Sequence, residues 1–388
     1  MFERLSSDLM IRFKRFGYLL VLVVPVVAGL CAWLVAHSPN ANFWAFFPVL
    51  FTFGVVPILD YMIGKDPANP TEDEQVPTMN NEVYYRVLTL MCLPVHFALV
   101  GYAGWVFINA DLAWYGQLAW LVSVGVMGGI IAINIGHELI HKDPKIENWA
   151  GGLFLASVTY AGFKVEHVRG HHVHVSTPDD ASSSRYNQSV YHFLPRAFAR
   201  NFVAAWRLEA ERLKRKGHSP FSLRNELIWW YGISLAFAVG FYVAFGWMGV
   251  LFFAAQSFFA AATLEVINYI EHYGLHRRVQ ENGRYERVTP AHSWNSNYLL
   301  TNMFLFHLQR HSDHHAYAKR RYQVLRHYDE SPQLPGGYAA MFVLALVPPL
   351  WKKVMNPRVE AYYEGELDQL FRDSKRVNNI AATQAPQA

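Results

Sequence analysis

The sequence has little cysteine and little charge. Only two of its 388 residues are cysteines, Cys31 and Cys92, and both lie inside apolar runs. Neither belongs to a Cys-x-x-Cys pair, which excludes a disulfide framework, a zinc ribbon and an iron–sulfur centre built from this chain. Charged residues make up 16%, against about 25% in an ordinary soluble domain. Hydrophobic residues make up 52%, which excludes a disordered or collagen-like chain.

Charge is absent from four long stretches of the chain. These stretches lie between Arg15 and Asp60, Arg86 and Asp111, Asp111 and Glu138, and Glu226 and Glu265. A helix rises 1.5 Å per residue and needs about 20 apolar residues to cross the hydrocarbon, so the first and last stretches can each hold two crossings. The pattern predicts an all-α integral membrane protein with six transmembrane helices and a cytoplasmic helical His-rich region. The expected spans lie near residues 17–36, 43–62, 87–108, 113–135, 227–246 and 248–267.

Basic residues lie on one side of this predicted bundle. The turns near 37–42, 109–112 and 247 contain no Lys or Arg, so all 34 basic residues fall on the opposite side. By the positive-inside rule, we expect both termini and most of the chain outside the membrane to be cytoplasmic. The segment from Tyr18 to Ala36 is long enough to span and leads into a second span, so we interpret it as a retained helix rather than a secretory signal.

Five segments follow from this division. Residues 1–135 hold an N-terminal arm and the first four spans, and residues 227–267 hold the last two. Residues 136–226 and 268–377 form cytoplasmic regions, where amphipathic patterns such as that of residues 206–213 indicate helices. Residues 378–388 are rich in Ala, Gln and Pro, and we expect a disordered tail there.

Histidine is abundant and clustered. Nine of the 18 histidines fall in four short segments, namely His137-Glu138-Leu139-Ile140-His141, Glu166-His167-Val168-Arg169-Gly170-His171-His172, Glu271-His272 and His311-Ser312-Asp313-His314-His315. Residues four apart share one face of a helix. We therefore expect three pairs each to point at one ion, and His172 and His314 to turn towards a neighbouring position. The pairs are His137 with His141, His167 with His171, and His311 with His315.

Nine imidazoles are too many for one four-coordinate zinc ion, and imidazole also suits iron, copper and nickel. The sequence therefore predicts a dinuclear metal centre directly below the bundle, at one face of the membrane. The predicted ligands are His137, His141, His167, His171, His172, His272, His311, His314 and His315.

Four carboxylates adjoin these histidines in the sequence: Glu138, Glu166, Glu271 and Asp313. Carboxylates commonly orient a metal-bound imidazole through its second ring nitrogen. We predict this role for all four, and whether one of them is itself a ligand stays open.

Other interpretations account for part of the pattern. His137-Glu138-x-x-His141 is also the H-E-x-x-H pattern of zinc peptidases, so an intramembrane metalloprotease is one alternative. Such an enzyme needs a single further ligand and would leave most of the clustered histidines without a role. A membrane protein that binds metal without catalysis is an alternative from another class. His96, in the middle of a span, is predicted to hydrogen-bond a neighbouring helix.

The histidine segments resemble the three-box signature of the integral-membrane desaturase and hydroxylase superfamily, and within it the bacterial alkane 1-monooxygenases. Two further segments, residues 268–274 and 292–297, carry the same resemblance, which runs from about residue 45 to residue 360. One departure is Ile140, where glycine is usual in the family. This position is not a ligand, so the departure leaves the predicted metal site unchanged.

The resemblance implies a non-haem enzyme with two Fe ions and no haem, flavin or nucleotide. Such an enzyme hydroxylates the terminal methyl of medium-chain n-alkanes to 1-alkanols, using O2 and electrons from rubredoxin. The rubredoxin would be a separate protein or fused beyond Ala388. The implied location is the bacterial inner membrane, with the lipid bilayer as surroundings and no nucleic-acid partner. A fatty-acyl desaturase or an aromatic-methyl hydroxylase of the same superfamily is the alternative.

An alkane substrate has physical requirements of its own. It has no group to hydrogen-bond, so its affinity must come from burying CH2 groups, at about 0.8 kcal/mol each. We therefore expect a blind apolar channel inside the bundle that points at the metals and exposes only the last methyl.

Overall fold

The computed structural model describes residues 7–367, and these residues form helices, turns and irregular segments without a β-strand. This confirms the all-α prediction. The predicted tail, residues 378–388, lies outside the described residues, as do the first six residues of the N-terminal arm.

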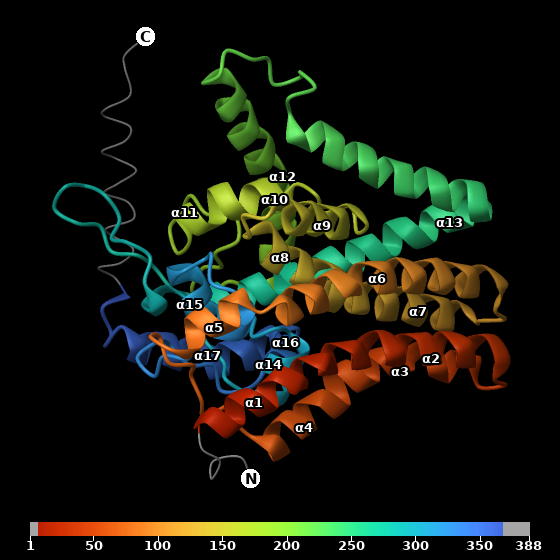
Figure 1. Cartoon of the computed structure of the whole chain (residues 1–388), viewed down its shortest axis with the longest axis horizontal. Helices are drawn as coiled ribbons and strands as arrows, with labels where there is room; N and C mark the ends of the chain where they lie inside the picture. The colour runs from red at the N-terminus through yellow and green to blue at the C-terminus, as the bar shows by residue number, and fades with distance from the viewer. Residues whose placement is uncertain (1–6, 368–388) are drawn as a thin grey trace.

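Five helical segments are long and apolar enough to cross a membrane. They are Ser7–His37 (α1 Ser7–Gly17, η2 Tyr18–Leu22, α2 Val23–His37), Ala41–Ile63 (α3 Ala41–Leu50, η3 Phe51–Val55, α4 Val56–Ile63), Val83–Asn109 (α6), Trp114–Ile140 (α7 Trp114–Gly128, η4 Gly129–Ile133, α8 Asn134–Ile140) and Glu226–His272 (α13). Figure 1 shows these long segments running side by side, with the short helices gathered at one end.

The segment α13 is two helical arms joined at Gly246, whose φ of 65° and ψ of −157° break the helix. Glycine reaches this conformation because it has no Cβ. The two arms fold back on each other at the end of the bundle that also carries the turns after α2 and α6 (Figure 1). Counted separately, the arms raise the number of apolar segments to the six expected from the sequence. That each of them crosses a bilayer stays a prediction.

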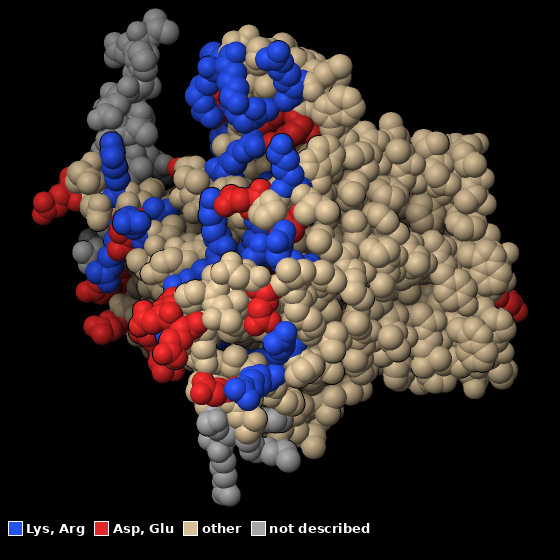
Figure 2. Space-filling model, viewed as in Figure 1, with Lys and Arg blue, Asp and Glu red and all other residues tan. Residues whose placement is uncertain are grey.

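Charged side chains gather on one half of the surface shown in Figure 2, whereas the half built by the long helices is almost free of them. Large hydrophobic side chains on these helices are exposed, including Leu30, Ile58, Leu235 and Val243. An apolar surface of this extent suits lipid rather than water. The chain is therefore an integral membrane protein.

The central helix α7 packs between α3 and α13. Gly125 permits the close approach, since a Cβ at this position would collide with Phe259 and with the backbone of Gln256. Small residues at helix contacts are how membrane helices pack closely. As a result, α8 and the end of α13 reach the same end of the bundle, where the remaining helices lie (Figure 1).

Shorter helices fill the charged half of the molecule. They are α5 (Gln75–Asn81), α9 (Lys145–Ala156), α10 (Phe163–Glu166), η5 (His167–His171), α11 (His172–His174), α12 (Val190–Lys214), η6 (Pro290–His292), α14 (Leu299–Phe304), α15 (His311–Ala316), η7 (Tyr322–Val324), α16 (Tyr338–Ala345) and α17 (Pro348–Tyr362). Much of the core beneath them is polar, because the buried residues include most of the histidines and several carboxylates.

Candidate metal centre

The nine clustered histidines meet at the junction of the two halves. His137 lies in α8 and His141 directly follows it, His167 and His171 lie in η5, His172 opens α11, His272 ends α13, and His311, His314 and His315 lie in α15. Eight of the nine are buried, and His172 is partly buried. Segments more than 170 residues apart in the sequence, from His137 to His311, thus contribute to one site.

The nine imidazoles divide into two groups. We call His137, His141, His167, His172 and His314 the first histidine group, and His171, His272, His311 and His315 the second histidine group. Within each group, one ring nitrogen per histidine can be chosen so that all of them lie within 4.8 Å of one another. Each group is therefore a set of ligand atoms converging on one point, and the two sets adjoin.

Ring nitrogens face one another at short range inside both groups. His172 Nε2 lies 3.1 Å from His167 Nε2 and 3.1 Å from His314 Nε2, and His315 Nε2 lies 2.9 Å from His311 Nε2. Other buried ring nitrogens have no hydrogen-bond partner among the described residues, including Nε2 of His141, His171 and His272. An unpaired buried nitrogen costs free energy, and coordination to a metal ion removes that cost. The donor set therefore fits two metal ions.

Burial favours the neutral state, which is the state that binds metal, in six of these imidazoles. It lowers the pKa of six histidines that lie outside the membrane-spanning segments, with further lowering from neighbouring histidines. The six are His141, His167, His172, His311, His314 and His315.

The sequence-based pairing of the histidines is partly wrong. His137 with His141 and His311 with His315 fall in the same groups, as the four-residue spacing predicts, and His314 turns to the other group as expected. His167, however, shares the first group with His172, while His171 joins the second. The reason is that residues 167–171 form a π-helical turn. Its wider turn brings residues five apart onto one face.

One of the four predicted carboxylates contacts a clustered imidazole. Glu271 Oε2 lies 3.1 Å from His311 Nε2, and its Oε1 accepts a hydrogen bond of 2.8 Å from the Tyr338 hydroxyl. Glu271 is thus fixed at the edge of the second histidine group, where it is placed either to orient His311 or to bind a metal beside it.

The other three predicted carboxylates have different partners. Glu138 pairs with Lys142 at 3.0 Å and accepts from the Tyr322 backbone N–H. Asp313 accepts from the Arg326 backbone N–H at 2.9 Å and lies 3.3 Å from the Arg320 guanidinium. Burial, reinforced by nearby Asp180 and Glu265, raises the pKa of Glu166, and its Oε2 has no partner among the described residues. These three carboxylates are therefore next to a clustered histidine in the sequence, but their contacts are not with a clustered imidazole.

Asp180 is a carboxylate that the sequence analysis missed. Its Oδ2 lies 2.9 Å from His171 Nδ1 and accepts from the Ser183 hydroxyl at 2.5 Å. Burial alone would raise the pKa of Asp180, but His171 and the Ser183 hydrogen bond outweigh it and lower that pKa. An ionised Asp180 holds the proton of His171 on Nδ1 and leaves Nε2 free for a metal. No spacing rule pointed to Asp180, because it is nine residues away across a turn.

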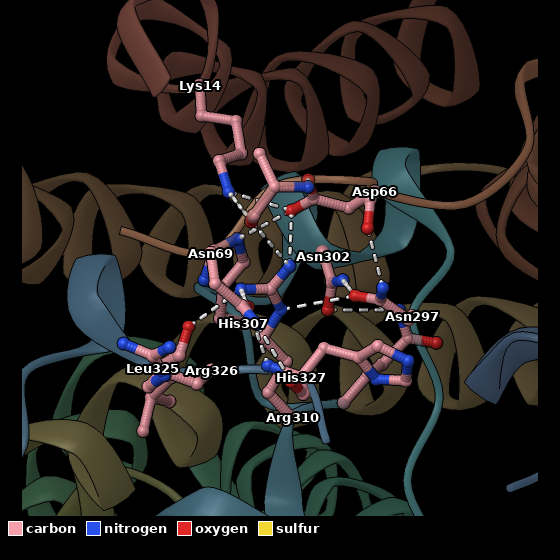
Figure 3. Close-up of polar contacts among 12 residues, drawn as sticks. Lys14, Asp66, Asn69, Asn297, Asn302, His307, Arg310, Leu325, Arg326 and His327 are labelled. Carbon is pink, nitrogen blue, oxygen red and sulfur yellow. Dashed lines mark hydrogen bonds and ion pairs between the residues drawn. The ribbon is translucent and has the colours of Figure 1, made fainter. Parts of the chain in front are cut away.

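The short helix α15 is held in place by a buried ionic cluster (Figure 3). Arg310 directly precedes His311, and its Nη2 lies 2.7 Å from Asp66 Oδ2. Lys14 of α1 binds the same oxygen at 2.9 Å. Arg310 also donates to the Leu325 carbonyl at 2.7 Å and to the Asn297 side chain at 3.1 Å. These contacts join α1, the segment after α4, and α15.

An apolar cavity reaches the histidines from inside the bundle. Most of its walls come from η3, η4, α13, α14 and α16, with single residues from α2, α4, α7 and α10. Its inner end carries His137, His167, His311 and Glu271. The cavity is small, with a volume of about 90 Å³. The structure therefore names lining residues that the sequence could not, namely Phe51, Thr52, Phe53, Val126, Ile130, Leu264, Ile267, Phe304, Leu305 and Phe342.

His96 makes the contact predicted for it. Its Nε2 lies 2.9 Å from the Ser157 hydroxyl of the loop after α9. The histidine thus links α6 to a neighbouring segment and lies outside both histidine groups.

Known proteins match nearly the whole length of the chain. The family model described as fatty acid desaturase matches residues 112–345. Alkane 1-monooxygenase 2 of Alcanivorax borkumensis is 66% identical, over 98% of this chain and 100% of that protein. Alkane 1-monooxygenases 2 and 1 of Pseudomonas aeruginosa are 60% and 56% identical, over 97% and 95% of this chain and 100% and 97% of theirs.

Proposed function

Since the chain belongs to the alkane 1-monooxygenases, within the fatty acid desaturase family, we propose that it hydroxylates the terminal methyl of medium-chain n-alkanes to 1-alkanols, using O2. One observation carries the proposal beyond the family assignment. An apolar cavity inside the membrane-spanning bundle ends on His137, His167, His311 and Glu271, members or neighbours of both histidine groups.

Two iron ions are the proposed cofactor. The first histidine group would hold one ion, and the second would hold the other, with Glu271 beside it. When bound, iron supplies the redox chemistry that activates O2 for insertion into a C–H bond. Imidazole nitrogen is compatible with iron, and the unpartnered buried nitrogens favour metal binding at this place.

The remaining residues act by binding, orientation and exclusion of water. Apolar walls such as Ile130, Leu264 and Phe304 would bind the alkane chain by burying CH2 groups, at about 0.8 kcal/mol each. Because the cavity is small, we expect the alkane to enter end-on, so that only its terminal methyl reaches the histidines. Asp180 keeps a proton on Nδ1 of His171, and Tyr338 holds Glu271 through a hydrogen bond.

A rubredoxin is the proposed electron donor. The chain has two cysteines, and both are buried in membrane-spanning segments, so a rubredoxin iron site must come from elsewhere. We place the protein in the bacterial inner membrane with both termini in the cytoplasm, since the charged half of the molecule carries the basic residues. A cysteine placed at Asn40 should then react with a membrane-impermeant maleimide in spheroplasts, and one at Lys216 only after lysis. The reverse labelling would contradict this orientation.

Turnover by the purified protein tests the proposed reaction. With rubredoxin, its reductase and NADH, we expect octane to give 1-octanol and the protein to contain about two irons. His141→Ala, His171→Ala and His315→Ala should each lower bound iron and abolish hydroxylation. His192→Ala, at an exposed position on α12, should do neither.

Other products would replace the proposal. Oleate formation from a stearoyl substrate would indicate a desaturase, and preferred oxidation of a xylene methyl would indicate an aromatic-methyl hydroxylase. Peptide cleavage with one zinc would indicate a peptidase. Full activity with stoichiometric iron in the three histidine variants would exclude the assigned metal centre.

A further inference from the structure

A second apolar pocket lies beside the cavity that ends on the histidines. It has a volume of about 470 Å³ and lies between α12, the two arms of α13 and the turn that follows α9. This volume is within the range of about 300–1,000 Å³ that is typical of small-molecule sites. We call it the side pocket.

The side pocket and the apolar cavity have one wall in common. Phe163 lines both of them. Its ring stacks on His167 of the first histidine group, with ring centroids 4.4 Å apart, and on Tyr160 of the side pocket, with centroids 5.8 Å apart. A phenylalanine ring therefore lies where the metal end of the cavity and the side pocket adjoin.

Most of the wall of the side pocket is apolar, but one part of it is polar. The Tyr160 hydroxyl donates to Glu265, and Asn201 Nδ2 donates to the same carboxylate oxygen at 2.9 Å. The Tyr160 oxygen accepts one long hydrogen bond, of 3.3 Å, from Asn201, so it can still accept from a ligand. Because the proton of Tyr160 goes to Glu265, this oxygen suits a ligand O–H group.

The rim of the side pocket lies where lipid and water meet. Phe202 of α12 and Phe258 of α13 both line the pocket and are exposed. Along α12, Val203 and Arg207 are exposed as well. Large apolar side chains exposed beside basic ones are typical of a helix that lies in the membrane interface. A molecule that leaves the side pocket at this rim would enter that interface.

The side pocket fits a long apolar chain that carries one hydroxyl group. An alkane would gain from the apolar walls but nothing from the Tyr160 oxygen, whereas a primary alcohol can use both. A fatty acid fits less well, because its carboxylate would approach Glu265.

We propose that the side pocket receives the primary alcohol after it leaves the metal centre past Phe163, and holds its hydroxyl on Tyr160 until release into the membrane interface. The inference rests on the proposed function, because hydroxylation of an alkane supplies the alcohol. It adds a second binding site, for the product, to the cavity that binds the substrate.

Photolabelling of the full-length protein in detergent tests the site. The probes are an eight-carbon primary alcohol with a diazirine at its far end and the matched alkane without the hydroxyl. We expect the alcohol probe to label the pocket-lining parts of α12 and α13 at least about fivefold more than the alkane probe does. Tyr160→Phe should remove about fivefold of this preference, the value of one ordinary hydrogen bond.

Filling the side pocket provides a second test that leaves the polar groups in place. Ala254 lines the pocket and is partly open to the surface, so Ala254→Phe should lower labelling by the alcohol probe at least about fivefold. Ala236→Phe makes the same change at an exposed alanine of the same helix outside the pocket, and should stay within about twofold of the wild type.

The route is tested by comparing alcohol formed with alcohol released. In a single turnover of octane, rapid quenching measures all of the 1-octanol, and a coupled alcohol dehydrogenase with NAD⁺ detects only the released part. Ala254→Phe should lengthen the delay between the two signals at least about threefold without changing the rate of hydroxylation, and Ala236→Phe should change neither.

Other results overturn the inference. Equal labelling by both probes would make the side pocket a site for alkanes, and full labelling in Ala254→Phe would place the alcohol elsewhere. An unchanged delay in Ala254→Phe would remove the side pocket from the release route. Failure of the proposed function is distinguishable, because photolabelling needs no turnover. A labelled side pocket in a protein that makes no 1-octanol would refute the function, whereas 1-octanol formation without labelling would refute the site.

Discussion

The hydrogen bond between Asp180 and His171 determines which nitrogen of that imidazole can bind a metal. With Nδ1–H held by the carboxylate, the lone pair of Nε2 points into the second histidine group, where it has no other partner among the described residues. Such outer partners typically account for about 10–100-fold in metal affinity.

Asp180→Ala should therefore lower iron affinity by about 10–100-fold, as measured by iron retained against a graded series of chelator concentrations. Asp180→Asn should lower the iron affinity less than Asp180→Ala, because the asparagine side-chain carbonyl can still accept a hydrogen bond from Nδ1–H of His171. The matched control is Asp179→Ala, which removes an exposed carboxylate next to it. Equal iron retention in the Asp180 and Asp179 variants would mean that His171 is oriented by something else.

The π-helical turn shows why the four-residue spacing rule fails for one pair of histidines. The spacing of His137 and His141, and of His311 and His315, correctly predicted shared groups because those residues lie on ordinary helical turns or directly after them. His167 and His171 have the same spacing but separate, because η5 has a wider turn. The residue types around η5 do not predict its wider turn. Similarly, Asp180 reaches His171 only through a turn that tertiary packing fixes.

The break in α13 depends on the backbone of one residue. Gly246 has a φ of 65° and a ψ of −157°. Residues with a Cβ rarely adopt this conformation, and it costs a non-glycine residue about 1–3 kcal/mol. The sequence indicated a turn here, since the charge-free stretch was long enough for two crossings. The sequence did not predict how tight this turn is, which is seen only in the backbone angles of Gly246.

Gly246→Ala should lower the free energy of unfolding by about 1–3 kcal/mol, seen as a lower thermal midpoint in detergent. The control is Gly240→Ala, in the same arm, where an added Cβ meets nothing within 4 Å. That variant should be neutral or slightly more stable because alanine favours helix. A Gly246→Ala protein as stable as Gly240→Ala would contradict the observed break.

The ionic cluster around Asp66 ties three elements together. Asp66 holds both Lys14 and Arg310, and all three side chains are buried (Figure 3). Burial alone would raise the pKa of Asp66, but the two cations outweigh it and lower that pKa, so the carboxylate is charged. The sequence analysis did not foresee the cluster, since its members are up to 296 residues apart.

Asp66→Asn leaves two buried cations without a counter-charge and should destabilise the protein by about 3–5 kcal/mol. Iron content should fall as well, because Arg310 is adjacent to His311. Thermal unfolding and metal analysis measure the two effects. Glu72→Gln, which removes a half-exposed carboxylate from Arg320 and Arg326, should cost about 1 kcal/mol or less. Similar losses in both variants would argue against a special role for the buried cluster.

Across the whole molecule, the two halves lie in different surroundings, one in lipid and one in water. The apolar half contains the cavity and faces lipid, where an alkane dissolves, and the charged half faces water. The histidines lie where these halves join. The charge-free stretches predicted this division, because burying charge in hydrocarbon is so unfavourable that the sequence must avoid it. The shape of the cavity could not be predicted, since it depends on how side chains from many separate segments pack.

The position of a residue along α7, η4 and α8, which form one wall of the cavity, indicates its distance from the histidines. Val126, Ile130, Asn134 and His137 all line it, and Val126 precedes His137 by eleven residues, about 16 Å along a helix axis. Val126 therefore marks a position far from the metal end.

Val126→Phe should shorten the space available to the alkane and leave the metal end unchanged. We expect kcat/KM for hexadecane to fall roughly tenfold or more relative to octane, measured as primary alcohol formed from each substrate alone and in competition. Leu118→Phe places the same aromatic ring at a lipid-exposed position of the same helix, and should leave the ratio unchanged. A parallel fall for both alkanes would mean that the chain does not extend along this wall, and that substrate length is read by a different part of the bundle.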